Sequence, residues 1–216
     1  MRSKVTVQPA LEPVTLSELK ASLRITSTEE DALLTQYIED ARIYVERMTG
    51  RKLITQTIVS YYDGFSGTQE IWFNGARRGT IESLSSGERH SVLEFPPAQS
   101  ITQVDTVDTS NAETVYASAN YYLDNYDDDM RARMVLNYDA SLSVTLRPQN
   151  NVKITYVAGY GDAASDVPSA LKRAIIVLSG ELYSNRGDCD TGTCSDKCGA
   201  SAMIGPYTLV NTSGLR

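Results

Sequence analysis

Histidine, tryptophan and long apolar runs are scarce in this chain of 216 residues. It has one His and one Trp, against 13 Tyr and 3 Phe. A single His excludes a metal site built from several imidazoles. No run approaches the ~18 consecutive apolar residues of a membrane span, and the first residues lack the apolar core of a signal peptide. We therefore expect a soluble chain, made in a cytoplasm, with no membrane partner.

Positive charge is also in short supply. The 20 Lys and Arg are outnumbered by 27 Asp and Glu, so the net charge is −7. Proteins that wrap nucleic acid draw their affinity from Lys and Arg that displace counterions from phosphates, and this class is disfavoured. The acidity is spread along the chain. This negative charge either serves solubility or gives a surface past which a polyanion moves without binding.

Two helices are expected near the N-terminus. Thr15 and Glu18 form a capping-box pattern ahead of a short helix at 16–23. A second helix of about 20 residues follows a start at Ser27, with acidic residues in its first turn. Its apolar residues recur at 3- and 4-residue steps, and Gly50 supplies the left-handed cap at its end.

The hydrophobic period changes from 3.6 to 2 between residues 53 and 158. Short β-rich segments separated by Gly, Asn, Asp and Pro predict a small antiparallel sandwich or barrel. We expect strands at 53–62, 71–73, 101–107, 114–116, 132–136, 143–146 and 152–157. A third helix, from Pro168 to about Tyr183, restores the helical period. The apolar faces of the second and third helices each need a partner, so we expect them to pack together.

The expected fold is therefore α+β, with a helical base that is interrupted in sequence. Residues 1–52 and 159–186 form the base, residues 53–158 an inserted β sandwich or barrel-like module, and residues 187–216 a Cys-rich loop and an extended C-terminal arm. The arm could add a strand to another subunit or pack back on its own base. We predict that this arm docks on a neighbouring subunit or another partner through its apolar side chains, which are Met203, Ile204, Tyr207, Leu209 and Val210.

The three cysteines lie together in the loop, at Cys189, Cys194 and Cys198. Their C-x4-C-x3-C spacing lacks the C-x2-C pair and the fourth Cys or His of a usual structural zinc site, although an Asp of the loop could complete one. A disulfide between two of them and three reduced thiols are the alternatives; the odd count favours reduced thiols. The thiols remain candidate metal ligands, and no bound cofactor is expected.

Motifs for catalysis are poorly represented. Residues 159–164 match the dinucleotide-binding pattern G-x-G-x-x-A, but the next helix begins only near Pro168, so its N-terminus would not face a pyrophosphate. We interpret these glycines as a tight strand-to-helix turn. The acidic run 124–129 lacks the Gly and Glu of a calcium loop. The chain has neither a G-x-S-x-G elbow nor a P-loop, and His90 has no evident catalytic partner. We expect no enzymatic activity.

Three stretches, taken in order and spacing, resemble one known family. They are residues 13–25 with 29–34, residues 41–46 with 49–56, and residues 156–162 with 167–186, and they include the motifs PVTLSELK, TGRKLITQ and YVAGYGD. Residues 96–101 and 121–124 match more loosely. On these residues the chain resembles the head-tail connector (adaptor, or head-completion) proteins of long-tailed bacteriophages and gene transfer agents.

The resemblance implies a structural virion protein without catalytic residues. Such proteins form a ring of about twelve subunits under the portal, extend the DNA channel, and provide a platform for the next component. The implied partners are the portal protein, identical subunits, the next head-completion (stopper) or tail protein, and double-stranded DNA that passes without sequence-specific binding. The implied location is the neck of the virion, after assembly in the host cytoplasm.

A second class of function remains open from the residues alone. A β-rich binding module, such as an adhesin or a carbohydrate-binding domain, would use Trp72 and the many tyrosines to stack on sugars. Such a module would not form a ring. Assembly therefore discriminates between the two interpretations.

Overall fold

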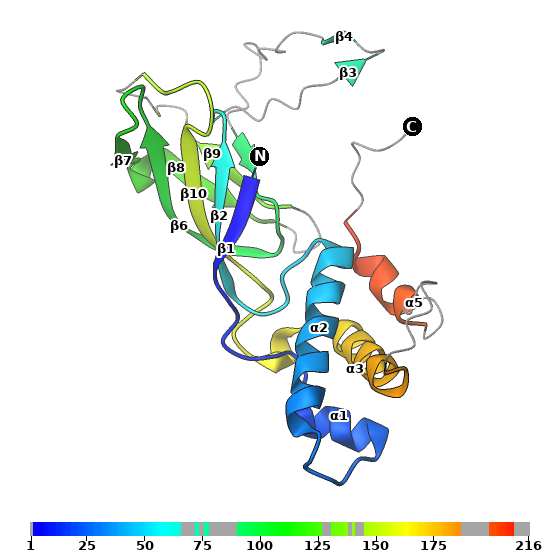
Figure 1. The fold of residues 1–216 in the computed structure, drawn as a ribbon. Coiled ribbons are helices and arrows are strands. Elements are labelled where there is room, and N and C mark those ends of the chain that lie inside the picture. The colour runs from blue at the N-terminus through cyan, green and yellow to red at the C-terminus, as the bar shows by residue number, and fades with distance from the viewer. Residues whose placement is uncertain are drawn as a thin grey trace. The chain divides into compact units, whose positions relative to one another are not determined.

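The computed structural model describes residues 2–65, 72–73, 76–77, 90–126, 131–137, 140, 145–186 and 199–209. The chain divides into two compact units (Figure 1). A β unit comprises Met1–Val7 and Thr57–Ala158, and a helical unit comprises Gln8–Gln56 and Gly159–Arg216. Helices and antiparallel strands are thus segregated along the chain, and the predicted α+β class is confirmed.

The helical unit is built on α1 (Leu16–Leu23), α2 (Asp31–Thr49) and α3 (Ser169–Ser184). The apolar faces of α2 and α3 contact each other, as predicted from their periodicity. Two short elements follow, α5 (Ala200–Ile204) and the 3-10 turn η3 (Gly205–Tyr207). The buried side chains of all these helices form one core, including Leu34, Ile38, Leu171, Ile175 and Ile204.

The ends of the first two helices follow the local signals of the sequence, with one correction. The capping box of α1 is present: the Glu18 N–H donates to Thr15 Oγ1 (3.2 Å), and the Thr15 N–H donates to Glu18 Oε2 (2.7 Å). Gly50 ends α2 with φ +71°, which Gly adopts without steric cost. However, α2 begins at Asp31 and not at Ser27, because the Ser27 hydroxyl accepts the Glu29 N–H and closes a tight turn instead.

The β unit contains a five-stranded sheet and a three-stranded sheet. The first has the order β1 (Arg2–Val7), β2 (Gln56–Tyr62), β10 (Val152–Ala158), β6 (Ala98–Val107) and β7 (Glu113–Val115), and the second has the order β5 (His90–Val92), β9 (Arg133–Leu136) and β8 (Tyr121–Asp124). The short strands β3 (Trp72–Phe73) and β4 (Ala76–Arg77) pair with each other. Side chains of both sheets share one core, which includes Ile58, Val104, Met134, Ile154 and Tyr156.

Two segments differ from their expected structure. Residues 2–7, which we expected in the helical base, form β1 and pair antiparallel with β2, with Arg2 opposite Tyr61 and Val5 opposite Ile58. Residues 200–207, which we expected in an extended arm, are helical. Both corrections have a tertiary cause: β1 and α5 are too short to be stable alone and form against a surface that the rest of the chain supplies.

Candidate functional site

A buried ion cluster joins the end of α2 to the segment that follows it. Glu46 is 5% exposed, and its carboxylate accepts hydrogen bonds from Lys52 Nζ (2.8 Å) and Gln56 Nε2 (2.8 Å). The Leu53 backbone N–H donates to the same carboxylate (3.3 Å), and the Arg42 guanidinium lies 3.6 Å from it. A carboxylate is stable away from water only where cations and donors replace its hydration. We call these side chains the Glu46 cluster.

The two glycines of the G-x-G-x-x-A pattern serve chain packing. Residues 159–161 lie against residues 53–55, to which two backbone hydrogen bonds of 3.1 Å join them. Gly159 has φ +139°, and a Cβ there would lie 2.6 Å from the carbonyl carbon of Ile54. The three-residue 3-10 turn η2 (Ala164–Asp166) follows these glycines, and the next α-helix begins at Ser169. The glycine turn therefore does not lead directly into the N-terminus of an α-helix, which a phosphate-binding loop requires.

The predicted docking residues are folded against the helical unit. Element α5 contacts α2 and α3, and Ile204, which is 3% exposed, lies in their core. Met203 and Tyr207 are half-buried against the same core. Arg51 Nε donates to the Tyr207 carbonyl at 2.7 Å, which holds the end of η3 to the residue after the α2 cap. Docking through this surface stays a prediction, now for a compact surface instead of an extended arm.

Leu209 continues the same attachment. Its N–H donates to the Thr49 carbonyl (3.0 Å), and its side chain lies beside Gly50, where an added Cβ would come within 3.1 Å of Leu209 Cδ1. The glycine cap of α2 therefore also leaves room for the C-terminal segment. The last predicted docking residue, Val210, lies outside the described residues.

The predicted metal candidates Cys189, Cys194 and Cys198 also lie outside the described residues. Elsewhere, in the ranges that the structure describes, no three His, Cys, Asp or Glu side chains gather closely enough to hold a metal ion. No helix of that part of the chain is both long and apolar enough to cross a membrane.

An exposed charged cluster ties the end of α3 to the start of α2. The Glu30 carboxylate accepts hydrogen bonds from Arg186 NH1 (2.6 Å) and the Tyr183 hydroxyl (2.8 Å). The Arg186 guanidinium also lies 4.2 Å from the centre of the Tyr183 ring, a cation–π contact. The hydrogen bond from Arg186, followed by that from Tyr183, lowers the pKa of Glu30 to about 2.

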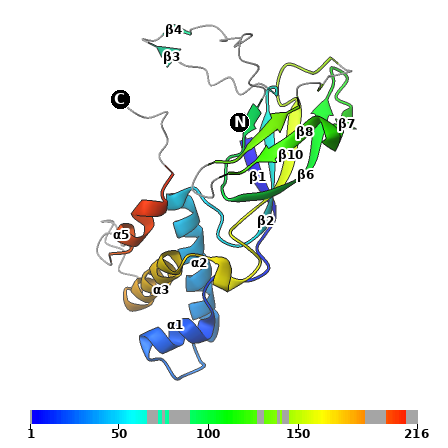
Figure 2. The ribbon, with the colours of Figure 1, turned by 180° about the vertical axis from the view of Figure 1, so that it is seen from behind.

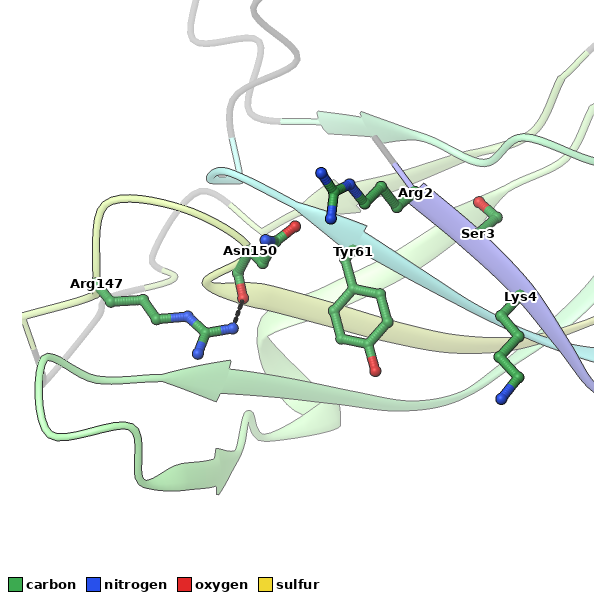
Figure 3. A pocket seen from close by; sticks show the side chains of 6 residues that line it. All are labelled: Arg2, Ser3, Lys4, Tyr61, Arg147 and Asn150. Carbon is green, nitrogen blue, oxygen red and sulfur yellow. Dashed lines mark hydrogen bonds between the residues drawn. The ribbon is translucent and has the colours of Figure 1, made fainter.

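Sequence reasoning missed an open cationic groove in the β unit (Figure 3). The groove has a volume of about 280 Å³ and is lined by Arg2, Ser3, Lys4, Tyr61, Arg147 and Asn150. The Arg147 guanidinium is fixed by the carbonyls of Gln149 (2.8 Å) and Asn150 (2.7 Å). Within the described ranges, no carboxylate forms an ion pair with any of these three cations. Arg147 is distant in the sequence from Arg2 and Lys4, so no local motif indicated that the three cations gather.

The five-stranded sheet ends in two unlike edges. Among the described strands, β1 has only β2 as a neighbour and β7 has only β6. Each edge strand exposes a valine, Val7 at 57% and Val115 at 64%. The β1 edge carries Arg2 and Lys4, whereas the β7 edge carries Glu113. Unpaired strand edges present free backbone donors and acceptors and are natural sites of association.

The part of the chain that holds α1, α2 and the Glu46 cluster is similar to a known family. Residues 13–78 match the model of the phage gp6-like head-tail connector protein family. This confirms, over residues 13–78, the resemblance predicted from the motifs of residues 13–186: this segment is similar to a gp6-like head-tail connector domain.

Solved structures share the fold over the whole chain. A chain from the neck of the empty gene transfer agent (GTA) particle, in C6 symmetry, is 23% identical, with a TM-score of 0.74 and coverage of 100% of both chains. A chain from the virion of the native GTA particle is 22% identical, with a TM-score of 0.71, over 99% of this chain and 98% of that one. A chain from the neck of the native GTA particle, in C12 symmetry, is 21% identical, with a TM-score of 0.68 and full coverage of both. No curated protein matches the chain.

Proposed function

We propose that this chain is a structural neck protein, a head-tail connector that forms a ring under the portal of a phage-like particle. In that position it extends the DNA channel and offers a platform to the next stopper or tail component. One observation supports the proposal most strongly: residues 13–78 match a connector domain in a chain whose whole fold is similar to chains of gene transfer agent necks. The C6 and C12 symmetry of those necks supports a ring of identical subunits.

The internal contacts suit a rigid building block. The Gly159 turn and the packed C-terminal segment each join parts of the helical unit that are distant in sequence, and the Glu46 cluster holds the end of α2 to the segment that follows it. Of the side chains assigned to docking from the sequence, Ile204 and Leu209 are part of this framework, and the half-buried Met203 and Tyr207 are the ones we propose to meet the portal.

The negative charge of the chain suits a conduit for DNA. The net charge of −7 disfavours adhesion of a polyanion, because phosphate binding depends on Lys and Arg. We therefore expect the side chains that face the channel to be acidic or neutral, so that the genome passes without sequence-specific binding.

Two tyrosines of the β unit lie in its core and are not available to a carbohydrate, whereas Tyr122 and Tyr126 are exposed. Tyr116 stacks between Phe65 (5.0 Å between ring centroids) and Tyr121 (6.3 Å) within the β unit. Tyr156 is fully buried. These rings contribute to the core, where they are not available to a sugar.

The test of the proposed function is assembly on portal-bearing capsids, followed by electron microscopy of the portal vertex. We expect a ring of this chain on the portal. In the variant Met203→Asp a charge falls on the proposed docking surface, and the ring should be lost, whereas Ala202→Asp, an exposed neighbour in the same short helix, should assemble normally. Circular dichroism must first show that both variants are folded. A folded wild-type chain that leaves the portal bare would refute the function; equal binding by both variants would refute only the docking surface.

A further inference from the structure

We propose that neighbouring subunits join edge to edge, with β1 of one copy beside β7 of the next, so that the five-stranded sheet continues from subunit to subunit. The inference rests on the proposed ring and assigns the surface that builds it. The partner is a second copy of this chain.

The two edges are the free ends of one sheet. Figures 1 and 2 show β1 and β7 at its opposite margins, with β2, β10 and β6 between them. Because the two edges differ, a contact between them is head-to-tail, and contacts of this kind close into rings when the rotation between subunits permits. A contact of β1 with another β1 would instead make a closed pair.

Strand direction favours this pairing. Strand β1 runs antiparallel to β2, β10 to β6, and β6 to β7. Strands β2 and β10 also oppose each other: Asp63, just after β2, bonds the N–H of Asn150, just before β10 (2.6 Å), while Leu53, before β2, bonds Tyr160, after β10 (3.1 Å). Four reversals leave β1 and β7 running in the same direction. A small rotation about a ring axis therefore brings them together as a parallel pair.

The side-chain spacing of the two edges is matched. Lys4 stands opposite Val59, and Val7 stands opposite Thr57. Lys4 and Val7 are three positions apart in the chain, but their partners on β2 are only two apart, because the register shifts by one residue between Val5 and Val7. On the other edge, Glu113 stands opposite Val107 and Val115 opposite Asp105, again two positions apart. One parallel register therefore places Lys4 beside Glu113 of the next copy and Val7 beside its Val115.

All four side chains also share one face of the sheet. Val5 and Ile58 pack in the core of the β unit, so Lys4 and Val7, which alternate with them in register, face away from it. Near the other edge of the sheet, Val104 of β6 is a core residue. Its neighbour Asp105, and hence Val115 and Glu113, face away as well.

The two edges are complementary in charge and in exposed apolar surface. In the part of the chain that the structure describes, Lys4 has no acidic partner. Glu113 contacts Lys153 at 3.0 Å, but its side chain stays 55% exposed and can accept from a second cation. Val7 and Val115 are both more than half exposed, and their mutual burial removes apolar surface from water. Opposite charges side by side also set the register.

A zero-length carbodiimide cross-link tests the contact directly. Within one chain, Lys4 and Glu113 are separated by four strand spacings of ~4.8 Å, or about 19 Å, so an amide between them must join two copies. The Lys153–Glu113 pair, at 3.0 Å, is the internal positive control. We would cross-link rings assembled from mixed ¹⁵N-labelled and unlabelled chains and map the peptides by mass spectrometry. The inference predicts isotope-mixed Lys4–Glu113 cross-links. Rings that yield only the Lys153–Glu113 product would overturn it.

Charge reversal tests the energetics. Lys4→Glu and Glu113→Lys should each reduce the assembled fraction about tenfold or more, because like charges then meet at every interface, and the double variant should regain assembly. Arg47→Glu, an exposed reversal on α2, is the matched control and should assemble as wild type. If both single variants form rings normally, the edge pairing is wrong while the connector function stands. If the wild type forms no ring on portals, the proposed function fails as well.

Discussion

The Glu46 cluster allows a sharp test of how the connector domain is held together. The substitution Glu46→Gln keeps the size of the side chain and the oxygen that accepts from Gln56 and Leu53. It removes the negative charge that faces Lys52 at 2.8 Å and Arg42 at 3.6 Å. Arg42 keeps Glu12 as a partner at 2.7 Å. Lys52 is left with a neutral amide group in place of its carboxylate.

The expected cost follows from the burial of this pair. Removing one partner of a buried ion pair costs about 3–5 kcal/mol. We expect a loss at the lower end of this range, about 3 kcal/mol, because the Lys52 side chain is 13% exposed and can recover some hydration. For a unit of this size the melting temperature should fall by about 10 °C or more. Glu39→Gln is the control: its carboxylate is 58% exposed and 3.9 Å from Arg42, so the loss should stay within ~0.5 kcal/mol.

Urea unfolding followed by circular dichroism at the helical band provides the measurement, since α1, α2 and α3 all lie in the helical unit. Adding Lys52→Met to Glu46→Gln should recover about 2 kcal/mol, because the ammonium group that faced the lost carboxylate is then removed as well. Equal midpoints for Glu46→Gln and Glu39→Gln would show that the cluster contributes packing only and would refute the electrostatic reasoning.

Three further predictions concern the turn, the first helix and the exposed cluster. Gly159→Ala should lower the free energy of unfolding by at least ~3 kcal/mol, or prevent folding, because φ is +139° and the backbone of Ile54 leaves no room for a Cβ. Thermal melting measures this loss, with Gly205→Ala as the control, because an added Cβ at Gly205 meets no atom within 4 Å. Thr15→Ala should cost about 1 kcal/mol through loss of the capping box, seen as a lower urea midpoint. Arg186 lowers the pKa of Glu30 to about 2 from its ordinary 4.5. The stability from this contact is therefore present above pH 4.5 and is lost as the pH falls towards 2. An NMR titration of the Glu30 carboxylate with a midpoint near pH 4.5 would contradict this.

The helices were predictable because their determinants are local. The capping residues of α1, the apolar stripe of α2 and the Gly50 cap act within a few residues of one another, and the structure has each in its predicted place. The start of α2 was wrong by four residues, since the Ser27 hydroxyl bonds the Glu29 N–H in a turn. A tight turn and a first helical turn at these residues differ little in free energy, so sequence signals place helix starts poorly.

The docking surfaces were less predictable because they depend on which segments meet. The alternation in residues 2–7 is too short to predict a strand without its partner β2. The apolar segment near residue 204 has no sequence signal that separates an arm from a helix packed on its own unit. Glu46 occupies a polar position in a helix, and nothing local indicates that Lys52 and Gln56 fold back to surround it.

The amino-acid sequence by itself determined the α+β class, the helices α1, α2 and α3, the inserted run of strands and the connector resemblance, since period, caps and motif order are properties of neighbouring residues. Only the tertiary structure decided that β1 forms one edge of the sheet, that residues 200–207 are helical and pack on the helical unit, and that Lys4 and Glu113 lie at matched positions on opposite edges. The first two features depend on contacts between residues more than fifty positions apart, such as β1 with β2 and Arg51 with Tyr207. Their free energy depends on the burial and register that the folded chain creates.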